Sequence, residues 1–187
     1  MMIIFDDFLP SSNLKKNLTS SSLWDNLKPG APIQWVDHDK NLSNAFEHLC
    51  HLVWNEVVGI KQNINGWEYW TRLVTPLNAD GPAGPVGFHT DNDLDGIVDS
   101  EEEQRLVDSG EIKTADSGFI YYAHTEPCVG GYLEIKRGNG ELERIQPVPN
   151  RLIVFTPNAQ HRVTEVVKGY RRSIISNLWK QKPSKYV

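Results

Sequence analysis

The sequence has little cysteine and no long hydrophobic run. Cys50 and Cys128 are its two cysteines, and they lie far apart without a CxxC spacing, which excludes a disulfide framework and a zinc ribbon. No stretch approaches the roughly 20 apolar residues of a membrane helix. The apolar start of the chain lacks a basic leader and is interrupted at Asp6 and Asp7, so it does not read as a signal peptide. We therefore expect a cytoplasmic protein with no membrane partner.

Clustered basic residues are also missing. The chain has 19 Lys and Arg against 24 Asp and Glu, with a net charge of -5. Because phosphate binding depends on clustered Lys and Arg, nucleic acid is not expected as a partner. A length of 187 residues with 39% hydrophobic content is enough for one sizeable core but short for two ordinary domains. We expect one domain over residues 1–187, of unknown oligomeric state.

The N-terminal part of the chain carries helical signals. A short strand is expected over Ile3–Leu9. Pro10 then ends the strand, and the residues after it are of the types that cap the start of a helix. From Asn41, apolar residues recur at three- and four-residue spacing, which predicts an amphipathic helix that ends near Gly59. Together these signals predict helical N-terminal support over about 10–60.

The residue pattern changes after Trp67. Short β-branched or aromatic runs such as GFIYYAH, RLIVFTP and RRSIISNLW are separated by Gly, Pro or Asn, and no helix is expected between them. This predicts a β core over about 67–180. The fold class is therefore mainly β with flanking N-terminal helices (α+β), arranged as a double-sheet jelly roll or a related barrel.

Two histidines and one aspartate form the strongest chemical signal. In GFHTDND, His89 and Asp91 are two residues apart, so on an extended segment both side chains project to one face. His161 stands at the mouth of another predicted strand, after the turn-prone pair Pro157-Asn158. Two imidazoles and one carboxylate on one face of an octahedral ion leave positions open, as in non-haem Fe(II) oxygenases. We expect these three residues to be the metal ligands and the catalytic centre.

Arg171 follows within the predicted strand RRSIISNLW. Alternation along that strand puts Arg171, Ser173 and Ile175 on one face. An inward guanidinium is costly to bury without an anion, and its planar fork matches a carboxylate. Arg171 is therefore a candidate for binding an anionic ligand, and a structural carboxylate is the alternative partner.

Together these features resemble the prolyl 4-hydroxylase-like branch of the 2-oxoglutarate/Fe(II)-dependent dioxygenase superfamily. The matching pieces cover nearly the whole chain and comprise the opening MIIFDDFLP, His89-Thr-Asp91, Ile120-Tyr121-Tyr122, Gly130-Gly131, and His161-x9-Arg171-x-Ser173. The resemblance implies a double-stranded β-helix (jelly roll, cupin-like). It also implies Fe(II), with 2-oxoglutarate and O2 as co-substrates and ascorbate as a further candidate cofactor.

The resemblance also implies roles for individual residues. Arg171 would bind the distal carboxylate of 2-oxoglutarate, Tyr122 would donate its hydroxyl to that carboxylate, and Ser173 would assist. The reaction would release succinate and CO2 while a peptidyl or amino-acid substrate is hydroxylated, with prolyl residues as the first candidate. Asp91 favours hydroxylation, because halogenating relatives lack this carboxylate. Relatives acting on prolyl residues often carry a Tyr three residues before the first metal His, where this chain has Val86.

The acidic run after His89 supports a competing interpretation. Its residues fit the spacing of an EF-hand calcium loop, which would use Asp91, Asp93, Asp95, Asp99 and Glu102. The preceding GPAGPVGF disfavours the leading helix that an EF-hand needs. Two alternatives stay open: a non-catalytic jelly-roll recognition module that retains a divalent metal, with calcium a candidate, and an oxygenase of a free small molecule.

The remaining histidines carry weaker signals. His48 and His51 lie three apart on the predicted helix without a third ligand, which indicates a surface or packing role. His124 shares a predicted strand face with Tyr122, a position that would bring it near the active site.

Overall fold

The computed structural model describes residues 2–25, 33–59, 64–76, 86–92, 100–157 and 159–186. The strands of the larger sheet are β1 (Met2–Phe5), β2 (Gln34–Asp37), β3 (Gly66–Val74), β5 (Ser117–Tyr122), β9 (Leu152–Phe155) and β12 (Arg171–Trp179). Those of the smaller sheet are β4 (Val86–His89), β7 (Leu133–Lys136), β8 (Leu142–Ile145) and β10 (His161–Val163). A two-stranded ribbon joins β6 (Val129–Gly130) and β11 (Val166–Lys168).

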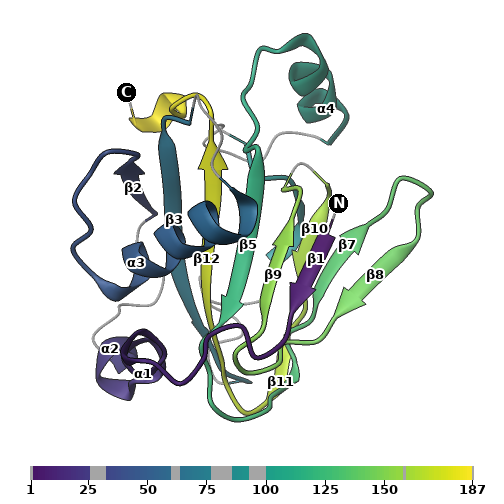
Figure 1. Cartoon of the computed structure of the whole chain (residues 1–187). Coiled ribbons are helices and arrows are strands. Elements are labelled where there is room, and N and C mark those ends of the chain that lie inside the picture. Colours follow the sequence, from purple (N-terminus) through teal and green to yellow (C-terminus); the bar gives the residue numbers. More distant parts are fainter. Residues whose placement is uncertain are drawn as a thin grey trace.

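The strands form a jelly roll. The larger sheet has the order β1-β9-β5-β12-β3-β2 and the smaller sheet the order β4-β10-β7-β8, with antiparallel pairing throughout. From β3 to β12 the chain crosses repeatedly between the two sheets, with β7 and β8 as consecutive strands of the smaller sheet (Figure 1). Aliphatic side chains from both sheets form one core between them, including Ile120 and Ile175 from the larger sheet and Leu133 from the smaller. The mainly β, jelly-roll prediction is confirmed.

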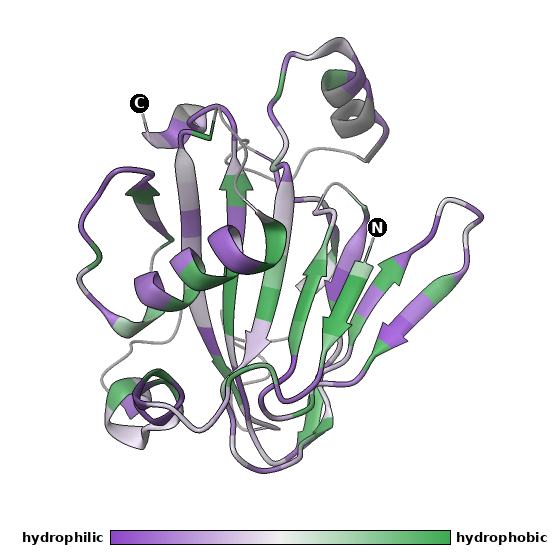
Figure 2. Ribbon diagram, viewed as in Figure 1, coloured by the Kyte–Doolittle hydropathy of each residue, from purple (hydrophilic) through white to green (hydrophobic). Residues whose placement is uncertain are grey.

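Helices cover the other face of the larger sheet. They are α1 (Asn13–Thr19), α2 (Ser21–Asp25), α3 (Ala45–Leu52) and the π-helix η1 (Val53–Val58). Helix α3 lies across the sheet in Figure 1, and Figure 2 shows hydrophobic and hydrophilic residues alternating along it. Its buried Leu49 packs in one cluster with Ile174 and Leu178 of β12. Because β12 is covered on both faces, all nine of its residues are buried.

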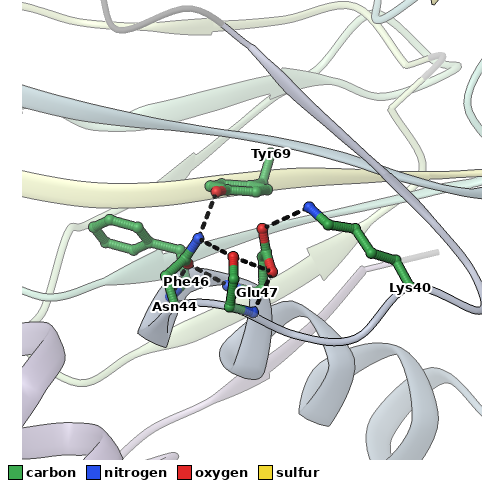
Figure 3. Close-up of polar contacts among 6 residues, drawn as sticks. Lys40, Asn44, Phe46, Glu47 and Tyr69 are labelled. Atoms are coloured by element: carbon green, nitrogen blue, oxygen red, sulfur yellow. Dashed lines mark hydrogen bonds and ion pairs between the residues drawn. The ribbon is translucent and has the colours of Figure 1, made fainter.

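Side-chain caps fix the start of α3 (Figure 3). The amide oxygen of Asn44 accepts hydrogen bonds from the backbone N–H groups of Phe46 (2.9 Å) and Glu47 (3.0 Å). The Asn44 amide donates to the hydroxyl of Tyr69 at 3.1 Å, and Lys40 pairs with Glu47 at 3.3 Å. These contacts satisfy N–H groups that a helix start leaves free, and they anchor the helix to β3.

The helix predicted from Asn41 to Gly59 is present, with a later start and two parts. It begins at Ala45, continues from α3 into the π-helix, and ends where Gly59 adopts a left-handed conformation with φ 68°. The strand expected over Ile3–Leu9 is shorter than predicted, because β1 ends before Asp7 turns the chain with φ 51°.

The expectation of no helix between the β-core strands is wrong. Helix α4 (Ser100–Ser109) lies between β4 and β5 and projects away from the sheets (Figure 1). The segment SEEEQRLVDS is rich in Glu, Gln, Arg and Leu, which have high helix propensity. A short 3-10 helix, η3 (Ser184–Tyr186), comes near the C-terminus. Within the described ranges, no helix combines the length and apolar character needed to span a membrane.

Candidate metal centre

Strand pairing brings the three predicted metal ligands together. His89 ends β4 and His161 begins β10, and these two residues face each other directly in the antiparallel ladder. Asp91 follows on an extended segment, and backbone hydrogen bonds hold this segment to the chain on either side of it. Its N–H donates to the carbonyl of Pro157 at 3.1 Å, and its carbonyl accepts from the N–H of Ala115 at 3.3 Å. The backbone therefore fixes where the carboxylate points.

The potential ligand atoms of the triad converge. One from each of His89, Asp91 and His161 lies within 4.8 Å of the others, close enough for the three to hold a metal ion. Nε2 of His89 is 3.7 Å from Oδ1 of Asp91, and Nε2 of His161 is 3.7 Å from Oδ2. The two imidazole ring centroids are 4.3 Å apart. The three side chains face one common point.

Backbone carbonyls orient both imidazoles. Nδ1 of His89 lies 2.8 Å from the carbonyl oxygen of Gly87, and Nδ1 of His161 lies 2.9 Å from that of Ala159. A carbonyl oxygen can only accept, so each Nδ1 carries the proton and each Nε2 keeps its lone pair toward the triad. Burial lowers the pKa of His161, which favours the neutral, metal-binding form of that ring.

The acidic member of the triad fits a cation. Oδ2 of Asp91 is buried and has no hydrogen-bond partner among the described residues, a costly state for a carboxylate. Its separation of 3.7 Å from the His161 nitrogen is too long for a hydrogen bond. That spacing suits two ligand bonds of about 2.1 Å meeting at a divalent ion. The donor set of two imidazoles and one carboxylate suits iron in particular.

Arg171 is buried on the inner face of β12. Its guanidinium donates to the carbonyl of Gly131 at 3.1 Å and to the hydroxyl of Ser173 at 3.4 Å, while its Nε has no partner within the part of the chain that the structure describes. Burial lowers the pKa of Arg171. Among the residues the structure describes, no carboxylate forms an ion pair with it, so the alternative of a structural carboxylate has no support there. A buried guanidinium in this state suits an anionic ligand.

Tyr122 lies beside this guanidinium. Tyr122 of β5 faces Ser173 of β12 in the ladder, and its ring centroid is 6.0 Å from Cζ of Arg171. Its hydroxyl is buried and has no hydrogen-bond partner in the described ranges, and burial raises the pKa of Tyr122 to about 12. The hydroxyl therefore stays protonated at neutral pH. Together with Nε of Arg171 it gives two buried donors that an anion could satisfy.

Two further residues lie close to Arg171 and were not identified from the sequence. Arg72 of β3 faces Ser173 from the side opposite Tyr122, and its charge acts on Arg171. Gly131 adopts φ +65°, and an added Cβ there would lie 3.3 Å from Cδ of Arg171. Alternation along GWEYWTRLV could have placed Arg72 on the inner face, but only the sheet pairing identifies its neighbours.

Several predicted features lie outside the described residues. These are Asp93, Asp95 and Asp99 of the calcium interpretation, together with Asn158 of the turn before His161. Nothing is described of the side chains of Val86 and Glu102 either. The calcium site therefore stays a prediction.

Comparison with known proteins gives a consistent family assignment. Residues 78–179 match the family model described as the 2OG-Fe(II) oxygenase superfamily. No curated protein matches the chain.

Similar solved structures share the fold. A prolyl-4-hydroxylase from Pseudomonas putida aligns with a TM-score of 0.60 and 18% identity, covering 97% of this chain and 93% of that chain. A Trichoplax adhaerens prolyl hydroxylase, solved with a hypoxia inducible factor peptide fragment, aligns with a TM-score of 0.60 and 16% identity, covering 99% of this chain and 86% of that chain. HygX from Streptomyces hygroscopicus, solved with nickel and 2-oxoglutarate, aligns with a TM-score of 0.53 and 11% identity, covering 95% of this chain and 82% of that chain. The resemblance to the prolyl 4-hydroxylase-like branch is confirmed at the level of the fold.

Proposed function

The chain belongs to the 2OG-Fe(II) oxygenase superfamily, whose enzymes use Fe(II), 2-oxoglutarate and O2, and from this premise we propose that it hydroxylates a peptidyl or amino-acid substrate. Prolyl residues are the first candidate. The observation that carries the proposal is the convergence of His89, Asp91 and His161 in a protein that also buries Arg171 without an ion-pair partner among its described residues.

In this proposal His89, Asp91 and His161 hold the iron. The two imidazoles bind through Nε2, because their Nδ1–H groups are engaged by backbone carbonyls. The carboxylate of Asp91 offsets part of the charge of the ion and gains the partner that its Oδ2 lacks. The bound iron supplies the activation of dioxygen.

The buried donors on the larger sheet hold the co-substrate. Arg171 binds the distal carboxylate of 2-oxoglutarate through its planar guanidinium, and Tyr122 donates its hydroxyl to the same group. Ser173, which already accepts from Arg171 at 3.4 Å, steadies the guanidinium. All three side chains are buried, so water competes little for the carboxylate.

The overall reaction then balances. One oxygen atom of O2 enters succinate as 2-oxoglutarate loses CO2, and the other enters a C–H bond of the substrate to give an alcohol. The carboxylate of Asp91 favours this outcome over halogenation. A peptide substrate draws support from the Trichoplax adhaerens prolyl hydroxylase, which shares the fold and was solved with a peptide fragment.

The activity is tested by succinate formation from 2-oxoglutarate with Fe(II) and O2, in the absence of a second substrate. We expect slow turnover by the wild type and none by His161→Ala, which removes a buried ligand. His48→Ala is the matched control, because His48 is an exposed residue of α3 outside the triad. Turnover that survives His161→Ala, or no succinate from iron-loaded wild type with any substrate, would overturn the proposal.

The substrate class is tested separately. Proline-containing peptides and free L-proline are each incubated with enzyme, Fe(II), 2-oxoglutarate and ascorbate, and the products are analysed by mass spectrometry. A gain of one oxygen atom on peptides alone supports a peptidyl substrate. The same gain on the free amino acid alone identifies a small-molecule oxygenase instead.

A further inference from the structure

His124 is buried close enough to Arg171 for the two side chains to interact electrostatically. Strand β5 ends at Tyr122, which pairs with Ser173, and one further hydrogen bond, from the N–H of Ala123 to the carbonyl of Arg172 at 2.9 Å, keeps the same register for the next residue. This bond places His124 opposite Arg171, on the face that also carries Tyr122. Facing residues next to a hydrogen-bonded pair in an antiparallel ladder have Cβ atoms about 4.5–5.5 Å apart.

The imidazole of His124 has an unused nitrogen in this pocket. His124 is 1% exposed, its ring centroid is 5.7 Å from that of Tyr122, and no described residue forms a hydrogen bond with its Nε2. Its Nδ1 lies 3.5 Å from the carbonyl oxygen of Arg172. The Tyr122 hydroxyl and Nε of Arg171 are likewise buried and unpartnered. Three orphan polar atoms therefore belong to neighbouring side chains on one sheet face, more than packing alone explains.

The surroundings of His124 favour its neutral form without a ligand. Burial lowers its pKa, hydrogen bonding to the carbonyls of Arg172 and Pro147 raises it, and the charges of Arg171 and Arg172 lower it. Tyr122 and Cys128, which lie close by, have pKa values raised by burial and are uncharged, whereas Arg72 of β3 adds a further positive charge near Arg171. Because Nδ1 faces a carbonyl, the proton resides there and Nε2 presents a lone pair.

We propose that His124 takes up a proton when the distal carboxylate of 2-oxoglutarate binds at Arg171, and that it then donates from Nε2 to that carboxylate. The inference rests on the proposed function. A lone pair facing a carboxylate is repulsive, whereas an imidazolium has donors on both nitrogens, one for the carbonyl of Arg172 and one for the ligand. The negative ligand also offsets the guanidinium charge that opposes protonation. The proton comes from solvent, so co-substrate binding is linked to pH.

Calorimetric titration of 2-oxoglutarate into Mn(II)-loaded protein without oxygen tests the linkage. Measurements near pH 7 in two buffers of different ionisation enthalpy give the number of protons taken up. We expect uptake approaching one proton in the wild type, and an affinity that falls by up to roughly tenfold per pH unit at higher pH. Tyr122, Cys128 and Arg171 are already protonated at this pH, so they cannot supply the signal.

Two variants sharpen the experiment. His124→Gln keeps an N–H donor that does not titrate, so it should bind 2-oxoglutarate without proton uptake and with a nearly flat pH profile. His51→Gln, on the exposed side of α3, should behave as the wild type. Wild-type binding without proton uptake, or an unchanged pH profile in His124→Gln, overturns the role of His124 and leaves the oxygenase proposal intact. Absence of any 2-oxoglutarate binding by metal-loaded wild type overturns both. If a variant does not fold, the measurement of proton uptake by the wild type still tests the proposal.

Discussion

Replacing Arg171 by methionine should separate ligand binding from stability. Arg171 is buried, and its recorded bonds within the described residues go to the carbonyl of Gly131 and the hydroxyl of Ser173, with no ion pair there. Methionine fills much of the same space without a charge. If the guanidinium serves a ligand, its removal should weaken 2-oxoglutarate binding while changing the folded protein little.

The structure sets the expected size of each effect. Replacing a buried ion pair by apolar side chains of similar volume is often neutral or stabilising by about 1–4 kcal/mol, so removing a buried charge without an ion-pair partner among the described residues should cost little by itself. Loss of the bond to Gly131 costs about 1–3 kcal/mol. The free energy of unfolding of the ligand-free protein should therefore change by less than about 2 kcal/mol. Removing one partner of a buried ion pair costs about 3–5 kcal/mol. The affinity for 2-oxoglutarate should fall by about a hundred- to several-thousand-fold.

Arg172 provides the matched control. It is the next residue of the same strand, but it faces the helices, with its guanidinium 5.8 Å from the ring of Trp24 and 5.0 Å from that of Tyr170. It also donates to the carbonyl of Thr19 at 3.4 Å. Arg172→Met should lower the free energy of unfolding by about 1–3 kcal/mol through these lost contacts and change 2-oxoglutarate affinity far less than Arg171→Met does.

Urea denaturation of the metal-free variants and calorimetric titration of the Mn(II)-loaded variants measure the two quantities. The reasoning fails if Arg171→Met loses more than about 3 kcal/mol of stability, the loss expected when a structural charge pair is broken. It also fails if the 2-oxoglutarate affinity of that variant changes by less than about tenfold, a difference of about 1.4 kcal/mol.

Three further perturbations test other parts of the structure. Asp91→Asn should abolish tight Fe(II) or Mn(II) binding, measured by titration, without lowering the free energy of unfolding of the metal-free protein, because Oδ2 of Asp91 has no partner to lose. Gly131→Ala should lower stability by about 1–2 kcal/mol or more and also lower 2-oxoglutarate affinity, because φ is +65° and a Cβ would lie 2.9 Å from Cγ2 of Val166 and 3.3 Å from Cδ of Arg171. Gly140→Ala is the control, because Gly140 has φ +84° with open space around it: this variant should lose only about 1 kcal/mol of stability and keep its 2-oxoglutarate affinity. Equal losses of stability and affinity in the two glycine variants would contradict the idea that a Cβ at Gly131 crowds its neighbours. Glu47→Gln should destabilise the protein by about 1–2 kcal/mol at pH 7 in thermal or urea unfolding. Burial raises the pKa of Glu47, but hydrogen bonds from Ser43 and Lys40 outweigh it and the pKa is lowered. Because the pKa of Glu47 is lower in the folded state, this carboxylate stabilises the folded protein at pH values above its unfolded pKa of about 4.3, and that stabilisation is lost as the pH falls through the folded pKa. The difference in unfolding free energy between wild type and Glu47→Gln should therefore vanish in acid. A difference that does not change with pH would contradict this prediction.

Sequence patterns identified most of the elements because local chemistry determines them. Alternation along RRSIISNLW placed Arg171 and Ser173 on one face, and the amphipathic spacing before Gly59 identified the main helix. Helix α4 was missed although SEEEQRLVDS has strong helix propensity, because the preceding acidic residues suggested a loop. The existence of each element is a local property, so it could be read from neighbouring residues.

The sequence by itself determined which residue types were available for chemistry: two histidines, an aspartate and an arginine at spacings suited to one metal and one anion. Tertiary structure alone decided their partners, because the register between strands distant in sequence sets which side chains face each other. That register pairs His161 with His89, and its continuation sets His124 opposite Arg171. Burial likewise depends on the whole fold, so only the folded chain reveals that the Asp91 carboxylate, the Tyr122 hydroxyl and the His124 imidazole hold atoms without partners.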